Sequence, residues 1–239
     1  ATLAWKAGLF ACFISGVMEL AGAFIGDALR RVTPRAAMLS SLAGIAITFI
    51  AMGFVFQIFA TPALGLLPML LILVCYAAKL KLPLGLPAGF VAVVVGTLLA
   101  WALRAAGLAP AMSPAAITPA AFHPPHWAGG SLFGFLVSKV GWSYLAVIVA
   151  MGLFNIIGSL QCLESAAAAG DRFPTRPSLL ANGVGSIVAA CLGSPFATTL
   201  YIGHPGWKAM GARWSYSWLN GAAICTIALC EAHGRARDE

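Results

Sequence analysis

The sequence contains very little charge. Only 9% of its 239 residues are Asp, Glu, Lys or Arg, whereas soluble domains carry about 25%. The remaining composition is 61% hydrophobic, and several apolar blocks reach the roughly 20 residues that a helix needs to cross a bilayer. This composition excludes an ordinary soluble domain and predicts an all-α polytopic membrane protein.

The sequence also lacks the motifs of several functional classes. No CxxC pair is present, and nearly all of the six cysteines lie in apolar blocks, which favours buried small side chains over disulfides or a metal site. There is no Ser/His/Asp set, H-E-x-x-H or G-x-S-x-G motif, so we expect neither an enzyme nor a cofactor. The segment "HPPHW" holds His123 and His126 without a third ligand, so no zinc site is predicted there.

The basic residues of this chain lie in short runs between apolar blocks. These runs contain Arg30, Arg31, Arg35, Lys79, Lys81, Arg172 and Arg176. Alternate loops are therefore basic, and the positive-inside rule places them in the cytoplasm and the loop at 107–130 outside. The net charge of +7 is explained by topology, so we expect no nucleic-acid partner. We expect an integral protein of the bacterial inner membrane, with the lipid bilayer as its surroundings.

About seven to eight transmembrane segments are predicted. The apolar spans are 4–27, 36–60, 64–80, 85–106, 143–169, 178–194 and 214–231, and a shorter run at 131–138 is interpreted as a re-entrant or interfacial helix. Because the chain begins without Met and almost directly in a span, we expect it to be part of something longer.

One element, at about 195–212, is predicted to be discontinuous. Its sequence "PFATTLYIGHPG" favours an extended stretch between two helical segments, and non-helical backbone at membrane depth must face protein or a water-filled cavity. A half-helix beginning near Pro205 would direct its free N–H groups toward such a cavity, with His204 as a polar ligand and Trp207 as a wall. The alternative is an ordinary external loop.

The segment "FNIIGSLQCLESAAAAGD" at 154–171 is unusually polar for a membrane span. Helical periodicity puts Asn155, Ser159 and Cys162 on one face, where small residues allow close helix packing. A carboxylate such as Glu164 is costly in the membrane unless it is paired, hydrated or protonated. It therefore indicates either a transport role or a bond to a helix N-terminus or to Arg172.

Glu19 raises the same question in the middle of the first span. It has fewer polar neighbours in the sequence than Glu164. We therefore interpret Glu19 as a structural residue rather than as part of the binding site.

Two segments resemble a known family. "GLFNIIGSLQCLESAAAAGD" is similar to the eighth span of the nucleobase–cation symporters, which include xanthine, uracil and adenine/guanine permeases and nucleobase–ascorbate transporters. "RPSLLANGVGSIVAACLGSPFATTLYIGHPGWKAMGAR" is similar to their ninth and tenth spans. The resemblance implies a fold of two inverted repeats of seven spans, divided into a core and a gate domain, of which this chain matches spans four to eleven.

The resemblance also implies a domain organisation. Residues 1–32 would form a core-domain span, and 33–106 would form gate-domain spans. Residues 107–141 would be an external loop with a short helix. Residues 142–239 would form core-domain spans, including the broken helix at 195–212.

The function implied is secondary transport of a nucleobase-like small polar solute by elevator-type alternating access. The substrate-binding residues by this resemblance are Asn155, Ser159, Gln161, Glu164, Tyr201, Gly203 and His204. Asn155 and Gly203 stand where family members usually carry a carboxylate, so proton coupling would fall to Glu164 or His204. A coupling proton or sodium ion and a homodimer are compatible with this interpretation. The alternatives are a small-anion carrier of the same architecture, of the sulfate or bicarbonate kind, and a truncated non-transporting membrane fragment.

Overall fold

The regular structure of this protein is helical wherever it is described. The computed structural model describes residues 2–78, 80, 82, 85–108, 127–212 and 215–230, and no strand occurs among them. The helical stretches that are long and apolar enough to cross a membrane are Leu3–Val32, Arg35–Ala60, Ala88–Ala105 and Leu145–Ala168. These findings confirm the all-α class and support a membrane protein, whereas the count of seven to eight spans stays a prediction.

The chain divides into two compact units. The first takes its residues from 1–42 and 120–231, and the second from 43–119 and 232–239. Residues far apart in the sequence therefore belong to the first unit, while an intervening stretch forms the second. Whether these units correspond to a core and a gate domain stays a prediction. His123 and His126 lie outside the described residues.

The first unit holds the longest helices. Its elements are α1 (Thr2–Val32), most of α2 (Arg35–Ile45), α6 (Gly129–Leu136), α7 (Lys139–Ser143), α8 (Leu145–Ala168), α9 (Thr175–Cys191), α10 (His204–Ala209) and α11 (Tyr216–Cys230). A helix of 31 residues such as α1 is about 46 Å long and exceeds the roughly 30 Å of the hydrocarbon layer. Its last turn, with Arg30 and Arg31, can therefore extend into the interfacial region.

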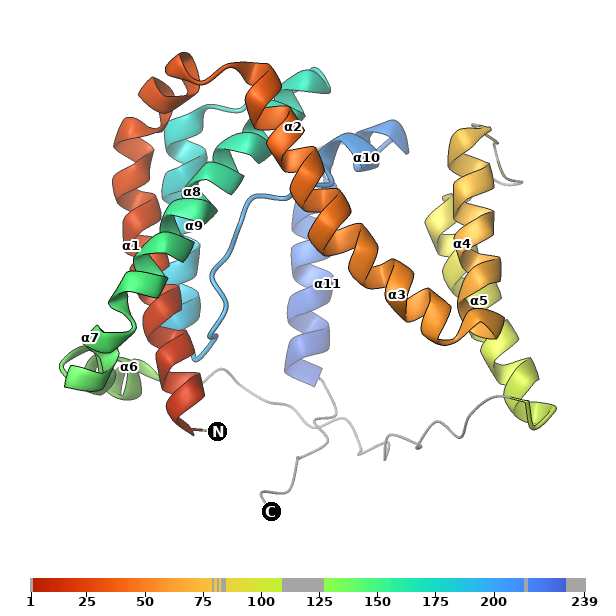
Figure 1. Ribbon diagram of the computed structural model, residues 1–239, viewed down its shortest axis with the longest axis horizontal. Coiled ribbons are helices and arrows are strands. Elements are labelled where there is room, and N and C mark those ends of the chain that lie inside the picture. Colours follow the sequence, from red (N-terminus) through yellow and green to blue (C-terminus); the bar gives the residue numbers. More distant parts are fainter. Residues whose placement is uncertain are drawn as a thin grey trace. The chain divides into compact units, whose positions relative to one another are not determined.

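Helices α1, α8 and α9 pack against one another and form the centre of the first unit (Figure 1). Where α1 crosses α9, Gly16 lies against Gly183. A Cβ atom added at Gly16 would come 2.9 Å from the carbonyl oxygen of Gly183, and one added at Gly183 would come 2.8 Å from that of Gly16. Small residues allow membrane helices to approach this closely, and here they bring the polar groups of the two helices within bonding range.

Glycines also end α8 and α9. Gly170 and Gly193 have φ of +95° and +96°, a conformation that residues with a Cβ rarely adopt. In both cases the next residue donates its N–H to a carbonyl five residues back, from Asp171 to Ala166 and from Ser194 to Ala189. This is the Schellman pattern of helix termination, and it turns the chain away from each helix.

The chain after Gly193 has no regular structure until α10 begins at His204. Through 194–203 it runs back beside α9 (Figure 1), and Thr198 bonds to Asn182 and Ser186 of that helix. Of the element predicted at 195–212, residues 195–203 are not helical and α10 follows them, but residues 195–203 form no strand. A discontinuous element at membrane depth stays a prediction.

The apolar core of the first unit is divided into two clusters along α1. One surrounds Leu9, Phe10 and Cys12, and the other surrounds Ala23 together with side chains of α8 and α9. Glu19 lies between them in the sequence of α1. A polar layer therefore separates two apolar layers.

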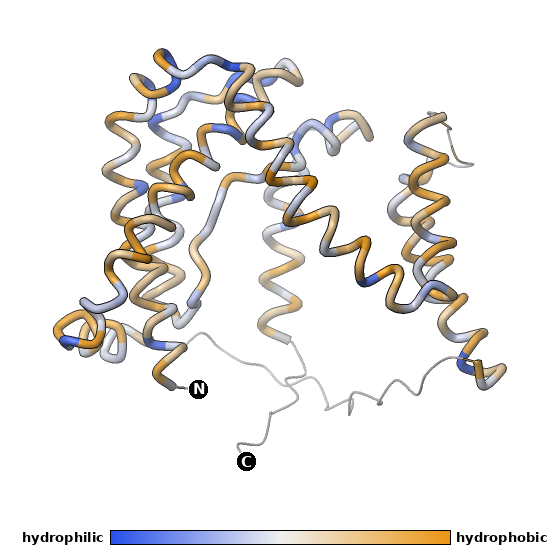
Figure 2. Tube along the Cα trace, in the orientation of Figure 1, coloured by the Kyte–Doolittle hydropathy of each residue, from blue (hydrophilic) through white to orange (hydrophobic). Residues whose placement is uncertain are grey.

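The second unit consists of η1 (Ala46–Ala51), α3 (Met52–Ala60), α4 (Pro62–Ala77) and α5 (Ala88–Ala105), with the last residues of α2. In Figure 2 these helices are coloured as mainly hydrophobic. Few of their side chains are buried, and Cys75 of α4 and Ala92 of α5 are the ones that are. Apolar side chains that stay exposed on membrane helices suit a lipid environment.

Candidate functional site: a buried carboxylate on helix α1

The most deeply buried carboxylate of the described chain belongs to Glu19, which is 0% exposed. Ser159 donates its hydroxyl to Glu19 Oε1 at 2.6 Å, and Asn182 donates its amide to the same oxygen at 2.6 Å. The Asn155 amide lies 3.3 Å from Glu19 Oε2. Three helices therefore contribute to one carboxylate site, because Glu19 is on α1, Ser159 and Asn155 on α8, and Asn182 on α9.

Helical spacing explains why these side chains converge. Asn155 and Ser159 are four residues apart on α8, and Asn182 and Ser186 are four apart on α9. Residues at i and i+4 lie on the same helix face. Both pairs therefore face α1 at the level of Glu19, close to the Gly16–Gly183 crossing.

Thr198, in the non-helical segment after α9, adds polar groups to those from the three helices. Its backbone N–H donates to Ser186 Oγ at 2.9 Å, and its hydroxyl donates to the carbonyl of Asn182 at 2.8 Å. The Thr198 carbonyl oxygen in turn lies 3.2 Å from the Asn182 amide and 3.5 Å from that of Asn155. We call Glu19, Asn155, Ser159, Asn182, Ser186 and Thr198 the Glu19 cluster.

The charge of the Glu19 cluster is not balanced by a cation. No Lys, Arg or His in the described residues forms an ion pair with Glu19. Its partners are neutral amides and a hydroxyl, and buried carboxylates normally need a cation, a metal or a proton. The cluster therefore suits a proton or a ligand N–H group more than a second anion.

Glu164 lies in a different place, where α1 and α8 end. Arg30 Nε donates to Glu164 Oε1 at 2.8 Å, and Arg35 Nε lies 3.3 Å from Oε2. Arg30 also donates to the Thr175 hydroxyl at 2.7 Å. Glu164 is thus ion-paired, and its partners are Arg30 and Arg35 rather than Arg172. Eleven residues of α1 separate Glu19 from Arg30, which is roughly 16 Å along the helix.

Gln161 faces a third location on α8. Its amide nitrogen donates to Ser41 Oγ at 3.0 Å, while its buried amide oxygen has no hydrogen-bond partner among the described residues. Both residues border a cavity of about 260 Å³ between α1, α2 and α8, lined otherwise mainly by apolar side chains. Gln161 therefore does not join the Glu19 cluster.

Tyr201, Gly203 and His204 belong to a fourth group. His204 Nε2 lies 2.8 Å from Asp171 Oδ2, and its Nδ1 bonds to the Tyr216 hydroxyl. Trp207 donates its indole N–H to the Tyr201 hydroxyl at 2.7 Å and stacks on Tyr216 with ring centroids 5.8 Å apart.

Gly203 stands immediately before α10 in this fourth group. A Cβ atom there would collide with the ring of Tyr201. Gly203 therefore leaves room for the Tyr201 ring, and in this conformation it offers no side chain that could bind a ligand.

Asp171 anchors this fourth group to the end of α8. Lys208 Nζ lies 2.8 Å from Asp171 Oδ1 and also donates to the Ala169 carbonyl at 2.8 Å. The hydrogen bond from Lys208, followed by that from His204, lowers the pKa of Asp171. The seven predicted binding residues are thus distributed over four locations, and only Asn155 and Ser159 share one with Glu19.

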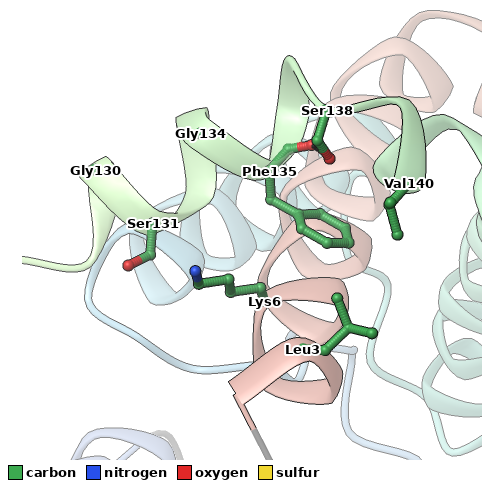
Figure 3. A pocket seen from close by; sticks show the side chains of 8 residues that line it. All are labelled: Leu3, Lys6, Gly130, Ser131, Gly134, Phe135, Ser138 and Val140. Carbon is green, nitrogen blue, oxygen red and sulfur yellow. Dashed lines mark hydrogen bonds between the residues drawn. The ribbon is translucent and has the colours of Figure 1, made fainter.

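A cavity of about 490 Å³ lies at the beginning of α1, beside α6 and α7 (Figure 3). Lys6 is its charged residue, and the other polar side chains that line it are Ser131 and Ser138. Thirteen residues of α1, roughly 20 Å, separate Lys6 from Glu19. We use Lys6 below as a control position.

Comparisons of the chain with family models, curated proteins and solved structures found no match. The resemblance to nucleobase–cation symporters therefore stays a prediction that rests on the two quoted segments. What the chain can do must be inferred from the geometry of the Glu19 cluster.

Proposed function

We propose that this chain carries the binding site of a secondary transporter for a small, nucleobase-like polar solute, and that Glu19 binds the coupling proton. The observation that carries the proposal is the burial of the Glu19 carboxylate in α1 among neutral donors from α8 and α9. Ionisable residues inside membrane helices are costly and usually belong to a solute or ion pathway. This proposal differs from the sequence-based prediction, which gave the coupling role to Glu164 or His204.

The polar groups of the Glu19 cluster suit a planar solute with both donors and acceptors. Asn155 and Asn182 offer amide groups, which can donate and accept, and the carboxylate can accept ring N–H groups. The Thr198 carbonyl adds an acceptor from a backbone segment that is not helical. In transporters, non-helical backbone of this kind lines the solute path.

Glu164 is less suited to the coupling role. Arg30 and Arg35 already neutralise it, so a proton on Glu164 would break two ion pairs instead of neutralising an unpaired charge. His204 is likewise held between Asp171 and Tyr216. Because a carboxylate without a cation also repels anions, the Glu19 cluster does not favour the small-anion carrier.

Solute binding by the purified protein in nanodiscs tests the proposal. A panel of uracil, xanthine, adenine and guanine should include at least one ligand, and Glu19→Gln should weaken its binding by roughly tenfold, as expected for one lost hydrogen bond in a buried site. Glu164→Gln is the matched control, since it makes the same chemical change on α8.

The two variants separate the two hypotheses. If Glu164→Gln abolishes binding while Glu19→Gln leaves it intact, the site lies where the sequence predicted it. If no member of the panel binds to the wild-type protein, the solute class is wrong.

A further inference from the structure

We infer that a basic cavity at the end of α1 and α8 binds a phosphate group, either of an anionic phospholipid or of a free phosphate ester. The cavity has a volume of about 490 Å³, and its charged residues are Arg30, Arg35, Arg172, Arg176, Asp27 and Glu164. The remaining lining comes largely from the first turn of α9 and the residues just before it. This inference goes beyond the proposed transport function and does not depend on it.

The charges that line the cavity are unequal in number. Four guanidinium groups face two carboxylates, which leaves an excess of two positive charges in one cavity. Glu164 is already bonded to Arg30 and Arg35. Arg172 has no hydrogen-bond or ion-pair partner within the described part of the chain, so its charge is available to a ligand.

Arg30 is held in a fixed position with part of its hydrogen-bonding capacity unused. Its Nε and Nη2 donate to Glu164, and its Nη1 donates to Thr175. A guanidinium has five N–H groups, so these three bonds leave two. Because Arg30 is only 19% exposed, this donor pair is partly shielded from water.

The beginning of α9 adds backbone donors to the same cavity. Pro174, Thr175, Arg176 and Pro177 all line it, and of these Thr175 and Arg176 carry a backbone N–H, since proline has none. Helix α9 has no side-chain cap and no acidic residue in its first turn. The first N–H groups of a helix are unpaired and lie at the positive end of its dipole, which favours anions. Here they reinforce the arginines.

The position of the cavity favours a lipid as the source of the phosphate. It lies at the end of two apolar helices, where phospholipid headgroups meet a membrane protein, and Figure 2 shows hydrophilic residues around the turns after α1 and α8. Arg176 lies 4.5 Å from the ring centroid of Phe24, whose side chain is 65% exposed. An acyl chain could therefore lie along Phe24 while its headgroup meets the arginines. Basic cavities of this kind bind anionic headgroups.

Native mass spectrometry of the purified protein with added lipid tests the inference. The wild type should retain phosphatidylglycerol in preference to phosphatidylcholine, and Arg172→Gln should weaken phosphatidylglycerol binding about fivefold, as expected for one basic residue near the headgroups. Arg172 is the best position to change, because no hydrogen bond or ion pair of the described residues is lost with it. Asp27→Asn should have the opposite effect and strengthen binding, since it removes a carboxylate that has no hydrogen-bond or ion-pair partner in the described part of the chain.

Two controls make the result specific. Lys6→Gln removes one positive charge at the other end of α1 and should leave lipid binding unchanged. A second arm uses inorganic phosphate with lipid-free protein in detergent: if it raises the melting temperature of the wild type but not of Arg172→Gln, the site also takes free phosphate. The inference is wrong if Arg172→Gln alters neither phosphatidylglycerol binding nor the effect of phosphate on the melting temperature. It is also wrong if Lys6→Gln weakens lipid binding as much as Arg172→Gln does.

Discussion

Glu19 is surrounded by residues whose side chains are satisfied only when α1, α8 and α9 are packed together. Ser159 and Asn182 each donate to it at 2.6 Å, and both are buried. A buried carboxylate that loses a donor keeps its desolvation cost but not the compensation. The Glu19 cluster therefore has a structural role even if it also binds solute.

The contribution of the Ser159–Glu19 hydrogen bond to the stability of the protein can be tested by removing the Ser159 hydroxyl. Ser159→Ala should lower the free energy of unfolding by about 1–2 kcal/mol, because it leaves one lone pair of Glu19 without a donor. Unfolding by SDS in mixed micelles measures this difference. Ser178→Ala is the control, since Ser178 is half-buried and its hydroxyl donates to the Pro174 carbonyl at the start of its own helix, away from Glu19. Equal losses in the two variants would show that the Ser159 bond adds nothing.

Asp171 gives a prediction about pH. Its pKa is lowered from 3.8, chiefly by the hydrogen bond from Lys208 and then by that from His204. A carboxylate whose pKa is lower in the folded state adds stability above its unfolded pKa and loses it as pH falls through the folded pKa. Wild type should therefore be more stable than Asp171→Asn near neutral pH, and the difference should decline only below about pH 4.

Thermal unfolding of both proteins across this pH range measures that difference. Comparison with Asp171→Asn removes the contribution of other acidic groups. A difference that already disappears well above pH 4 would contradict the assignment of the effect to Asp171.

At the scale of helices, the close crossing of α1 and α9 aligns the polar residues of the first unit. Gly16 and Gly183 allow this crossing because neither has a Cβ atom. The turn at Gly193 then returns the chain along α9, so that Thr198 reaches Asn182 and Ser186. The cluster thus depends on three glycine positions that carry no functional group.

Gly183→Ala should disturb this crossing. The added methyl group would lie 2.8 Å from the Gly16 carbonyl oxygen, and backbone cannot move aside as a flexible side chain can, so we expect a loss of about 1–3 kcal/mol. Gly158→Ala on α8 is the matched control, because nothing lies within 4 Å of its Cβ position. If both variants unfold like the wild type, the two helices do not cross as closely as described.

Local periodicity predicted the helices well and the tertiary partners poorly. The predicted span at 143–169 corresponds to α8 at Leu145–Ala168, and the shared face of Asn155 and Ser159 is observed, because both follow from the 3.6-residue repeat. The partner of Glu164 was not predictable in this way, since Arg30 is 134 residues away in the sequence.

The same limit explains why Glu19 was interpreted as structural. Its donors come from α8 and α9 and are not neighbours in the sequence. The sequence did contain a clearer indication of a polar site at Glu19. Asn182 and Ser186 are four residues apart, and therefore on one face, in a helix of mostly small residues. That pair indicates a polar face that must meet another polar group, and Glu19 of the first span was an available partner.

At the scale of the whole molecule, the charge distribution predicts the orientation in the membrane. The arginines after α1 and α8 belong to the same cavity, which agrees with a common side for both turns. By the positive-inside rule that side is the cytoplasm. The loop that begins after α5 would then be external.

Cysteine labelling in intact cells tests this orientation. In a variant without the native cysteines, Leu108→Cys should react with an impermeant thiol reagent added outside, because Leu108 is exposed and follows α5. Pro34→Cys, between α1 and α2, should react only after the cells are opened. Labelling of position 34 from outside would reverse the predicted topology.

Proton uptake on solute binding tests the central claim about Glu19 most directly. Calorimetric titration of the purified protein with the bound nucleobase, in buffers of different ionisation enthalpy, gives the number of protons exchanged. We predict close to one proton per solute for the wild type and for Glu164→Gln, and none for Glu19→Gln, because glutamine keeps the shape of the side chain but cannot titrate. Unchanged proton uptake in Glu19→Gln, or its loss in Glu164→Gln alone, would contradict the account.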